Sequence, residues 1–255
     1  MRQIRITLQY DGTNYSGWQI QKKGTTIQGL LEEALFSVTG EQLRINGAAR
    51  TDAGVHAFEQ VAVFKTLSRL EPPVLLRALN AHLTHDIRVI RAEECPPDFH
   101  PRYDAKSKTY TYLISQQGIY STFLQRYSWN IPYQLNTGVM QEAAECLVGT
   151  HDFSSFRASK CSSKHPVRTV SSLEVSRLSS VEFISFVFNT PVVKITIQAN
   201  AFLRHMARNI VGTLVDIGKG KHHPTMMKGI LGSKDRRQAG RTAPARGLFL
   251  ERIEY

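Results

Sequence analysis

The residues best suited to chemistry lie in the stretch GAARTDAGVHA at 47–57. Arg50 and Asp52 are two positions apart, so their side chains would project to the same side of an extended segment. A nearby guanidinium favours the ionised form of a carboxylate, and an ionised carboxylate serves as a nucleophile or a base. Gly54 permits positive φ and a close approach of the backbone to a ligand. The same residues also fit a hairpin turn in which the aspartate bonds its own backbone, and spacing alone favours that simpler interpretation.

Aromatic and histidine side chains are weaker candidates. Tyr110 and Tyr112 alternate along a strand pattern, so they are either rings that stack on a displaced base or ordinary core tyrosines. His56 fits a base or a ligand, but an ordinary histidine is favoured. The sequence contains no HExxH metal motif, no GxxxxGKS/T or GxGxxG nucleotide motif and no GxSxG nucleophile motif. No metal, ATP or nicotinamide is therefore expected.

An apolar helix is predicted at 201–217, and it carries two arginines. Arg204 and Arg208 are four residues apart, so they would share a helix face. An arginine on a mostly buried helix favours an anionic partner, either a protein carboxylate or a phosphate, although two solvated arginines fit equally well. The following basic residues would form a solvated face or follow a phosphate backbone. They are Lys219, Lys221, Lys234, Arg236, Arg237, Arg241 and Arg246.

Hydrophobic periodicity predicts the elements that position the Asp52 loop. A capping box of Thr25 and Gln28 would start the first helix, and Gly40 would end it. The order β-α-β-β-α-β is typical of the ferredoxin-like or split βαβ arrangement. The predicted elements are a strand at 3–10, a helix at 27–38, strands at 43–48 and 60–65, a helix from Pro73 and a strand at 87–90.

The second half repeats this outline with one extra strand. Its predicted elements are a strand at 108–115, a helix capped by Asn136, strands near 169–177, 182–188 and 192–198, the helix at 201–217 and a strand near 248–253. The boundary is expected in the polar stretch HPRYDAKS, which gives halves of 1–104 and 105–255. The prediction is an α+β protein with two ferredoxin-like or RRM-like halves.

The charge and the cysteine content of the sequence indicate which partners and which cellular location to expect. The 255 residues include 32 Lys and Arg against 21 Asp and Glu, a formal net charge of +11 that fits a polyanionic partner or a generic basic protein. The three cysteines form no CxxC pair, so neither a disulfide framework nor a thiolate metal site is expected. The N-terminus has no apolar signal-peptide region, and no apolar run is long enough to span a membrane. A reducing, cytosolic location is the default expectation.

Six segments together resemble the family of tRNA pseudouridine synthase A. They are YDGTNYSGWQIQ at 10–21, ARTDAGVHA at 49–57, DFHPRYDAKSKTYTYLI at 98–114, HDFSSFRA at 151–158, AFLRHMARNIVG at 201–212 and APARGLFLERIEY at 243–255. Each match alone is weak, but six in order along nearly the whole chain are very specific. The chain departs from the family pattern at Ala49, where glycine is common, and alanine disfavours positive φ.

The resemblance implies an enzyme that isomerises uridine to pseudouridine in the anticodon stem-loop of tRNAs, without metal or cofactor. It implies that Asp52 is the catalytic aspartate, that Arg50 lies beside it and that Arg208 matches a basic residue that pairs with it. Tyr110 would contact the target base. The resemblance further implies a cytoplasmic homodimer whose RRM-like halves share one continuous, largely antiparallel sheet flanked by helices.

Two other functions are weighed against this one. A non-catalytic RNA-binding protein with tandem RRM-like units would also be basic, but the strands lack the aromatic-rich RNP1 pattern. A nuclease or glycosylase would break a bond without remaking one, yet metal-dependent nucleases need several acidic ligands and the loop offers only Asp52 nearby. Pseudouridine formation needs no redox step and no energy input, which agrees with the motifs that the sequence lacks.

Overall fold

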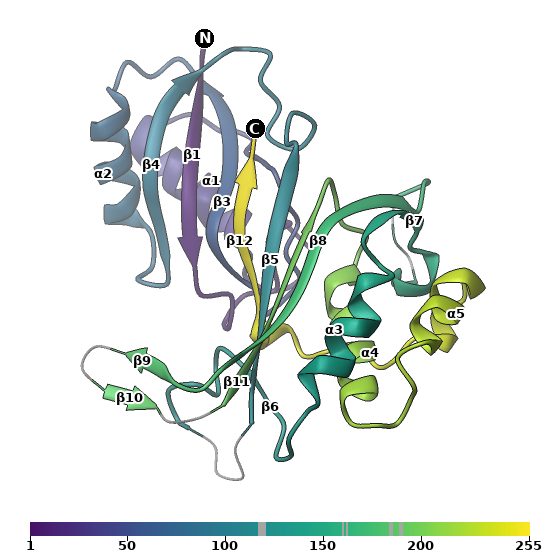
Figure 1. Cartoon of the computed structure of the whole chain (residues 1–255). Helices are drawn as coiled ribbons and strands as arrows, with labels where there is room; N and C mark the ends of the chain where they lie inside the picture. Colours follow the sequence, from purple (N-terminus) through teal and green to yellow (C-terminus); the bar gives the residue numbers. More distant parts are fainter. Residues whose placement is uncertain (117–120, 160, 162, 184–185, 189–190) are drawn as a thin grey trace. The chain divides into compact units, whose positions relative to one another are not determined.

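The structure, a computed structural model, describes residues 1–255 except 117–120, 160, 162, 184–185 and 189–190 (Figure 1). The chain divides into two compact units, one of Met1–Lys106 with Phe249–Tyr255 and one of Ser107–Leu248. This division lies two residues beyond the predicted boundary, and the last seven residues join the first unit. No helix in the described part of the chain has the length and apolar character needed to cross a membrane.

The first unit is a mostly antiparallel sheet with two helices. Its elements are β1 (Arg2–Tyr10), α1 (Ile27–Thr39), β2 (Asn46–Gly47), β3 (His56–Thr66), α2 (Pro72–His82), β4 (Ile87–Cys95) and β12 (Leu248–Glu254). The strand order is β4-β1-β3-β12, with β2 also on β3, and β12 runs parallel to β3. Figure 1 shows α1 behind these strands and α2 beside β4. The fully buried core includes Ile4, Ile6, Leu8, Leu31, Leu35, Leu75 and Leu79.

Two local predictions around α1 need correction. The N-cap is Thr26 rather than Thr25, because the Thr26 side chain accepts the Gly29 N–H, whereas Gln28 bonds elsewhere. Gly40 ends the helix with φ +72°, as predicted. The strand predicted at 43–48 is only Asn46–Gly47, because side chains of α1 bind the backbone N–H and carbonyl of Ile45.

The second unit also combines helices with a mostly antiparallel sheet. Its strands are β5 (Ser107–Ser115), β6 (Trp129–Asn130), β7 (Gly149–Asp152), β8 (Val167–Leu178), β9 (Val181–Phe183), β10 (Phe186–Phe188) and β11 (Val192–Ala199). The helices are α3 (Thr137–Glu145), α4 (Met206–Gly218) and α5 (Met226–Ser233). The strand order is β5-β11-β8-β7 with β6 parallel to β5, and β9 and β10 pair with each other. Helix α3 packs on β8 and α4 (Figure 1).

Helix α4 starts later than predicted, at Met206 instead of residue 201. His205 precedes it with φ +63°, a left-handed conformation that interrupts a right-handed helix. Arg204 therefore lies outside the helix, and the prediction that Arg204 and Arg208 share a helix face is wrong. Every residue of α4 except Arg208 is buried.

Candidate active site

Asp52 occupies the first position of a β-turn in the first unit. The Val55 N–H donates to the Asp52 carbonyl at 3.1 Å, and Gly54 has the positive φ, +76°, that a type II turn requires at its third position. Arg50 is exposed, Thr51 is buried and Asp52 is partly exposed, the alternation expected of an extended approach. The turn and the catalytic interpretations are therefore compatible, because the turn uses the backbone and leaves the carboxylate partly accessible.

Two bonds to the segment before α1 fix the start of this turn. The hydroxyls of Tyr10 and Thr51 lie 2.8 Å apart, and the Trp18 N–H donates to the Thr51 carbonyl at 3.0 Å. Burial raises the pKa of the Tyr10 hydroxyl well above its usual range, so it stays neutral. Both the side chain and the backbone of the residue before Asp52 are thus held in place.

Gln60, on β3, fixes the backbone of Ala49, three residues before Asp52. Its Oε1 accepts the Ala49 N–H at 3.1 Å, and its Nε2 donates to the Ala49 carbonyl at 2.8 Å. Gln60 is fully buried, and these two hydrogen bonds give its amide the partners that a buried polar group needs. Positive φ among the described non-glycine residues occurs at His205 and Lys234, so Ala49 has an ordinary backbone despite the family preference for glycine.

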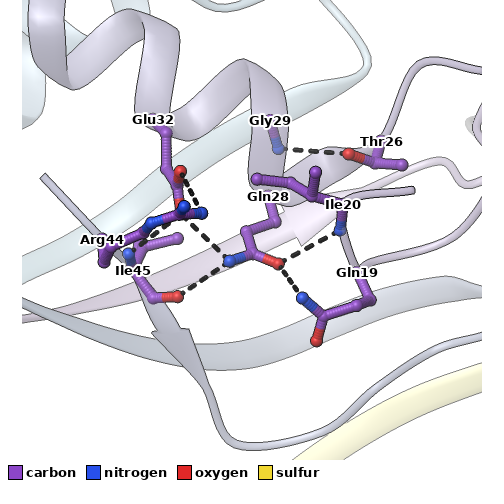
Figure 2. Close-up of polar contacts among 8 residues, drawn as sticks. All are labelled: Gln19, Ile20, Thr26, Gln28, Gly29, Glu32, Arg44 and Ile45. Carbon is purple, nitrogen blue, oxygen red and sulfur yellow. Dashed lines mark hydrogen bonds and ion pairs between the residues drawn. The ribbon is translucent and has the colours of Figure 1, made fainter. Parts of the chain in front are cut away.

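A buried glutamine of α1 joins three segments around the loop (Figure 2). The Gln28 Oε1 accepts from Gln19 Nε2 at 2.7 Å and from the Ile20 N–H at 3.2 Å. Its Nε2 donates to Glu32 Oε1 at 3.0 Å and to the Ile45 carbonyl at 3.2 Å. Gln28 therefore ties the segment that carries Trp18 to the strand that leads into the Asp52 loop.

Replacing Gln28 by leucine should destabilise the protein strongly for a single substitution. The change leaves the carbonyl of the buried Ile45 without this partner, and a buried polar group left unsatisfied costs about 1–3 kcal/mol. Chemical denaturation would measure the loss, with the exposed Gln9→Leu as the matched control. Equal unfolding midpoints for the two variants would show that Gln28 is not a structural link.

In the second unit, the two tyrosines of β5 have different surroundings. Tyr110 packs edge-on against Phe202, with ring centroids 4.8 Å apart. Tyr112 is almost fully buried, lies edge-on to Trp129, and donates its hydroxyl to the Pro244 carbonyl at 2.8 Å. The hydroxyl of Tyr112 thus holds the segment that precedes β12, and Tyr110 is also buried, at 7% exposure.

Arg208 also binds the segment that precedes β12, at Ala243. Its Nε donates to the Ala243 carbonyl at 2.8 Å, and its own carbonyl accepts the Ala243 N–H at 3.1 Å. Burial raises the pKa of Tyr112, and the nearby positive charges of Arg208, Arg246 and Arg241 lower it in part. Three arginines therefore bring positive charge close to the Tyr112 hydroxyl.

Asn209, next to Arg208 in α4, binds the same segment at Thr242. It is fully buried, and its Nδ2 donates to the Phe156 carbonyl at 2.7 Å. Its Oδ1 accepts from Thr242 Oγ1 at 2.7 Å and from Arg236 Nη2 at 3.0 Å. Arg236 is therefore part of the scaffold and is not equivalent to its neighbour Arg237, whose side chain is 89% exposed and pairs with Asp235.

We expect Arg236→Ala and Arg237→Ala to differ in stability, although the sequence presents both as one basic run. The Arg236 guanidinium bonds Asn209, Thr242 and the Ala239 carbonyl, so its loss should cost about 1–2 kcal/mol. Arg237→Ala should melt close to wild type, because its side chain is solvated. Two superimposable melting curves would contradict this distinction.

The structure brings Arg50 and Asp52 together in one loop of the first unit and places Tyr110 and Arg208 in the second. Sequence reasoning missed Tyr10, Gln60 and Gln28, which position the Asp52 loop. Periodicity and motifs do not predict these links, because the sequence assigns Gln28 only to a helix-capping motif and gives no partner for Tyr10 or Gln60. Within the residues that the structure describes, no group of three or more His, Cys, Asp or Glu could hold a metal ion.

The family model of tRNA pseudouridine synthase matches residues 6–104 and 143–255. The chain is 44% identical to the tRNA pseudouridine synthase A of Thermoanaerobacter sp. (strain X514), over all 255 residues and the full length of both proteins. It is 41% identical to the proteins of the same name from Thermodesulfovibrio yellowstonii and Acetivibrio thermocellus, again over the full length of both. The Asp52 turn and Arg208 lie within the matched residues, and Tyr110 lies between the two matched ranges. The chain therefore belongs to the tRNA pseudouridine synthase family.

Proposed function

We propose that this enzyme isomerises uridine to pseudouridine in the anticodon stem-loop of tRNA, with the carboxylate of Asp52 as its catalytic group. Family membership establishes the broader activity, isomerisation of uridine in tRNA. The observation that supports the role of Asp52 is its position, partly exposed on a turn whose preceding residues are rigidly bonded. Such rigidity suits a group that must meet a reacting atom in one geometry.

The reaction requires bonds that a carboxylate can help to exchange. The C1′–N1 bond breaks, the uracil turns, C5 joins C1′, and the hydrogen of C5 leaves as a proton while N1 gains one. The carboxylate attacks C1′, attacks C6 of the base or removes the C2′ proton, and each role needs the ionised form. The target nucleotide must first leave the stack, at a cost of a few kcal/mol.

The remaining site residues have supporting roles in the proposal. Arg50 lies two residues from Asp52 in the same loop and brings a positive charge to the site. Tyr110 contacts the displaced uracil, a role that the family resemblance implies. Arg208 supplies positive charge to the same reaction. The net charge of +11 supports attraction of the tRNA backbone.

The proposal extends to the organisation of the enzyme. It has two ferredoxin-like or RRM-like halves, acts as a cytoplasmic homodimer and uses no metal or cofactor. In the first unit β1 lies between β4 and β3, and β2 also pairs with β3, which supports the ferredoxin-like description. The other features rest on the family resemblance alone.

Nucleoside and mass analysis of treated tRNA tests the proposal against its alternatives. Isomerisation produces pseudouridine in the anticodon stem-loop while the mass of the tRNA stays unchanged. A tandem RRM-like protein without catalytic activity would bind the tRNA and produce no new nucleoside. A nuclease or glycosylase would change the mass, so either of these two outcomes would reject the proposal.

A further inference from the structure

A buried histidine lies directly behind the Asp52 turn. His56 is the first residue of β3 and is only 2% exposed. Its ring stacks on Phe249, with centroids 4.7 Å apart and an interplanar angle of 26°. Its Nδ1 lies 3.0 Å from Asp11 Oδ1 and 3.1 Å from the backbone nitrogen of Gly12. The imidazole therefore combines apolar packing with a polar link to another segment.

The partners of His56 form a tight turn after β1. Asp11 Oδ1 accepts from the Thr13 N–H at 2.9 Å and from the Thr13 hydroxyl at 2.5 Å. The Asp11 N–H donates to the Asp86 carbonyl at 2.9 Å, which anchors the turn to the start of the neighbouring strand β4. This turn is thus fixed independently of His56, so it can act as a support for the histidine.

The turn touches the Asp52 loop itself. A Cβ at Gly12 would lie 2.0 Å from the Val55 carbonyl oxygen, so only glycine permits this approach. Val55 closes the β-turn through its N–H bond to the Asp52 carbonyl. His56 follows Val55 in the chain and bonds the turn on which Val55 rests. The end of the Asp52 loop is therefore fixed twice, by the close packing of Gly12 against Val55 and by the bond of His56 to the Asp11–Gly12 turn.

We propose that His56 is a positioning residue, which fixes the Asp52 carboxylate through Asp11, Gly12 and Val55. This inference rests on the proposed catalytic role of Asp52. A protonated Nδ1 donates to Asp11 and an unprotonated Nδ1 accepts from Gly12, so either form ties the ring to the same turn. A displacement of about 1 Å at a reacting group can cost roughly 100-fold in rate, so loss of this link should slow the reaction.

Three substitutions separate the polar link from simple packing. His56→Phe keeps a ring against Phe249 but removes Nδ1. His56→Asn loses the ring but retains a polar group near the position of Nδ1. Phe249→Leu removes the stacking partner and leaves the polar link intact. If the link positions Asp52, the Asn variant should be faster than the Phe variant although it packs worse.

The test measures single-turnover pseudouridine formation at saturating enzyme, with tRNA affinity and melting curves recorded beside it. His56→Phe should be roughly 10- to 100-fold slower than wild type with nearly unchanged affinity, and His56→Asn and Phe249→Leu should retain most of the rate. Asp11→Ala, which removes one of the two partners of Nδ1, should slow the reaction by a smaller factor. Its combination with His56→Phe should cause no further loss, because the two residues share one interaction.

A wild-type rate for His56→Phe would overturn the proposal, as would a Phe249→Leu variant as slow as His56→Phe. If His56→Phe does not fold, His56→Leu, which also lacks Nδ1, is assayed in its place, and a wild-type rate for that variant would overturn the proposal as well. Asp52→Asn is assayed in parallel to separate the two claims. An active Asp52→Asn enzyme refutes the catalytic assignment, whereas an inactive one beside a fully active His56→Phe refutes only the positioning role.

Discussion

Asp52→Asn should lose pseudouridine formation almost as completely as Asp52→Ala. Asparagine keeps the size and the turn preference of aspartate, so a residue that merely shapes the turn would tolerate it. The β-turn of the structure uses the Asp52 carbonyl, which both variants retain. A general base alone contributes about 10²–10⁴-fold, so we expect the rate to fall by at least that factor. Quantifying pseudouridine in tRNA after a fixed incubation measures the loss.

The controls for Asp52→Asn are a melting curve and a tRNA binding titration. Stability should stay near wild type, because Thr51 and Ala49 keep their bonds to Tyr10 and Gln60. Affinity should persist, because phosphate contacts elsewhere dominate binding to nucleic acid. Substantial turnover by Asp52→Asn would move the search for a carboxylate to Asp104 or Asp152.

Tyr110→Ala should have the second largest effect on activity. Loss of stacking on one base costs about 1–3 kcal/mol, which corresponds to roughly 5- to 150-fold in single-turnover rate. Tyr110→Phe keeps the ring and its contact with Phe202, so it should be less impaired than alanine and should reveal whether the hydroxyl is used. Rates equal to wild type for both variants would remove Tyr110 from the site.

Tyr112→Phe is the matched control on the same strand face. It removes the hydroxyl that bonds the Pro244 carbonyl, so it should lower stability by about 1 kcal/mol. Its rate per folded molecule should change less than that of Tyr110→Ala. The opposite ranking would exchange the roles assigned to the two tyrosines.

Much of the fold follows from local patterns in the sequence. The apolar spacing at 27–38 predicts α1 and Gly40 predicts its end, because both signals act within one turn of helix. The alternation at Tyr110 and Tyr112 likewise predicts the strand β5, although the structure also buries Thr109 and Thr111 on its other face. Such features depend on neighbours in the chain, so a single sequence is sufficient to show them.

Other features depend on contacts between distant residues and could not be predicted. The strand predicted at 43–48 is shorter because Gln28 and Glu32 bind Ile45. Helix α4 starts at Met206 because His205 adopts positive φ, which an apolar pattern does not reveal. The roles of Gln60 and His56 at the Asp52 loop depend on partners more than ten residues away, and no spacing rule identifies such partners.

Tritium release from tRNA labelled at uridine C5 tests the central claim most directly, because joining C5 to C1′ must expel that hydrogen. Wild-type enzyme and Asp52→Asn would be incubated with the same labelled tRNA, and tritium in water would be counted over time. We predict steady release by the wild type and almost none by Asp52→Asn at equal tRNA binding. A wild-type enzyme that binds the tRNA but releases no tritium would contradict uridine isomerisation, and equal release by both proteins would contradict the role of Asp52.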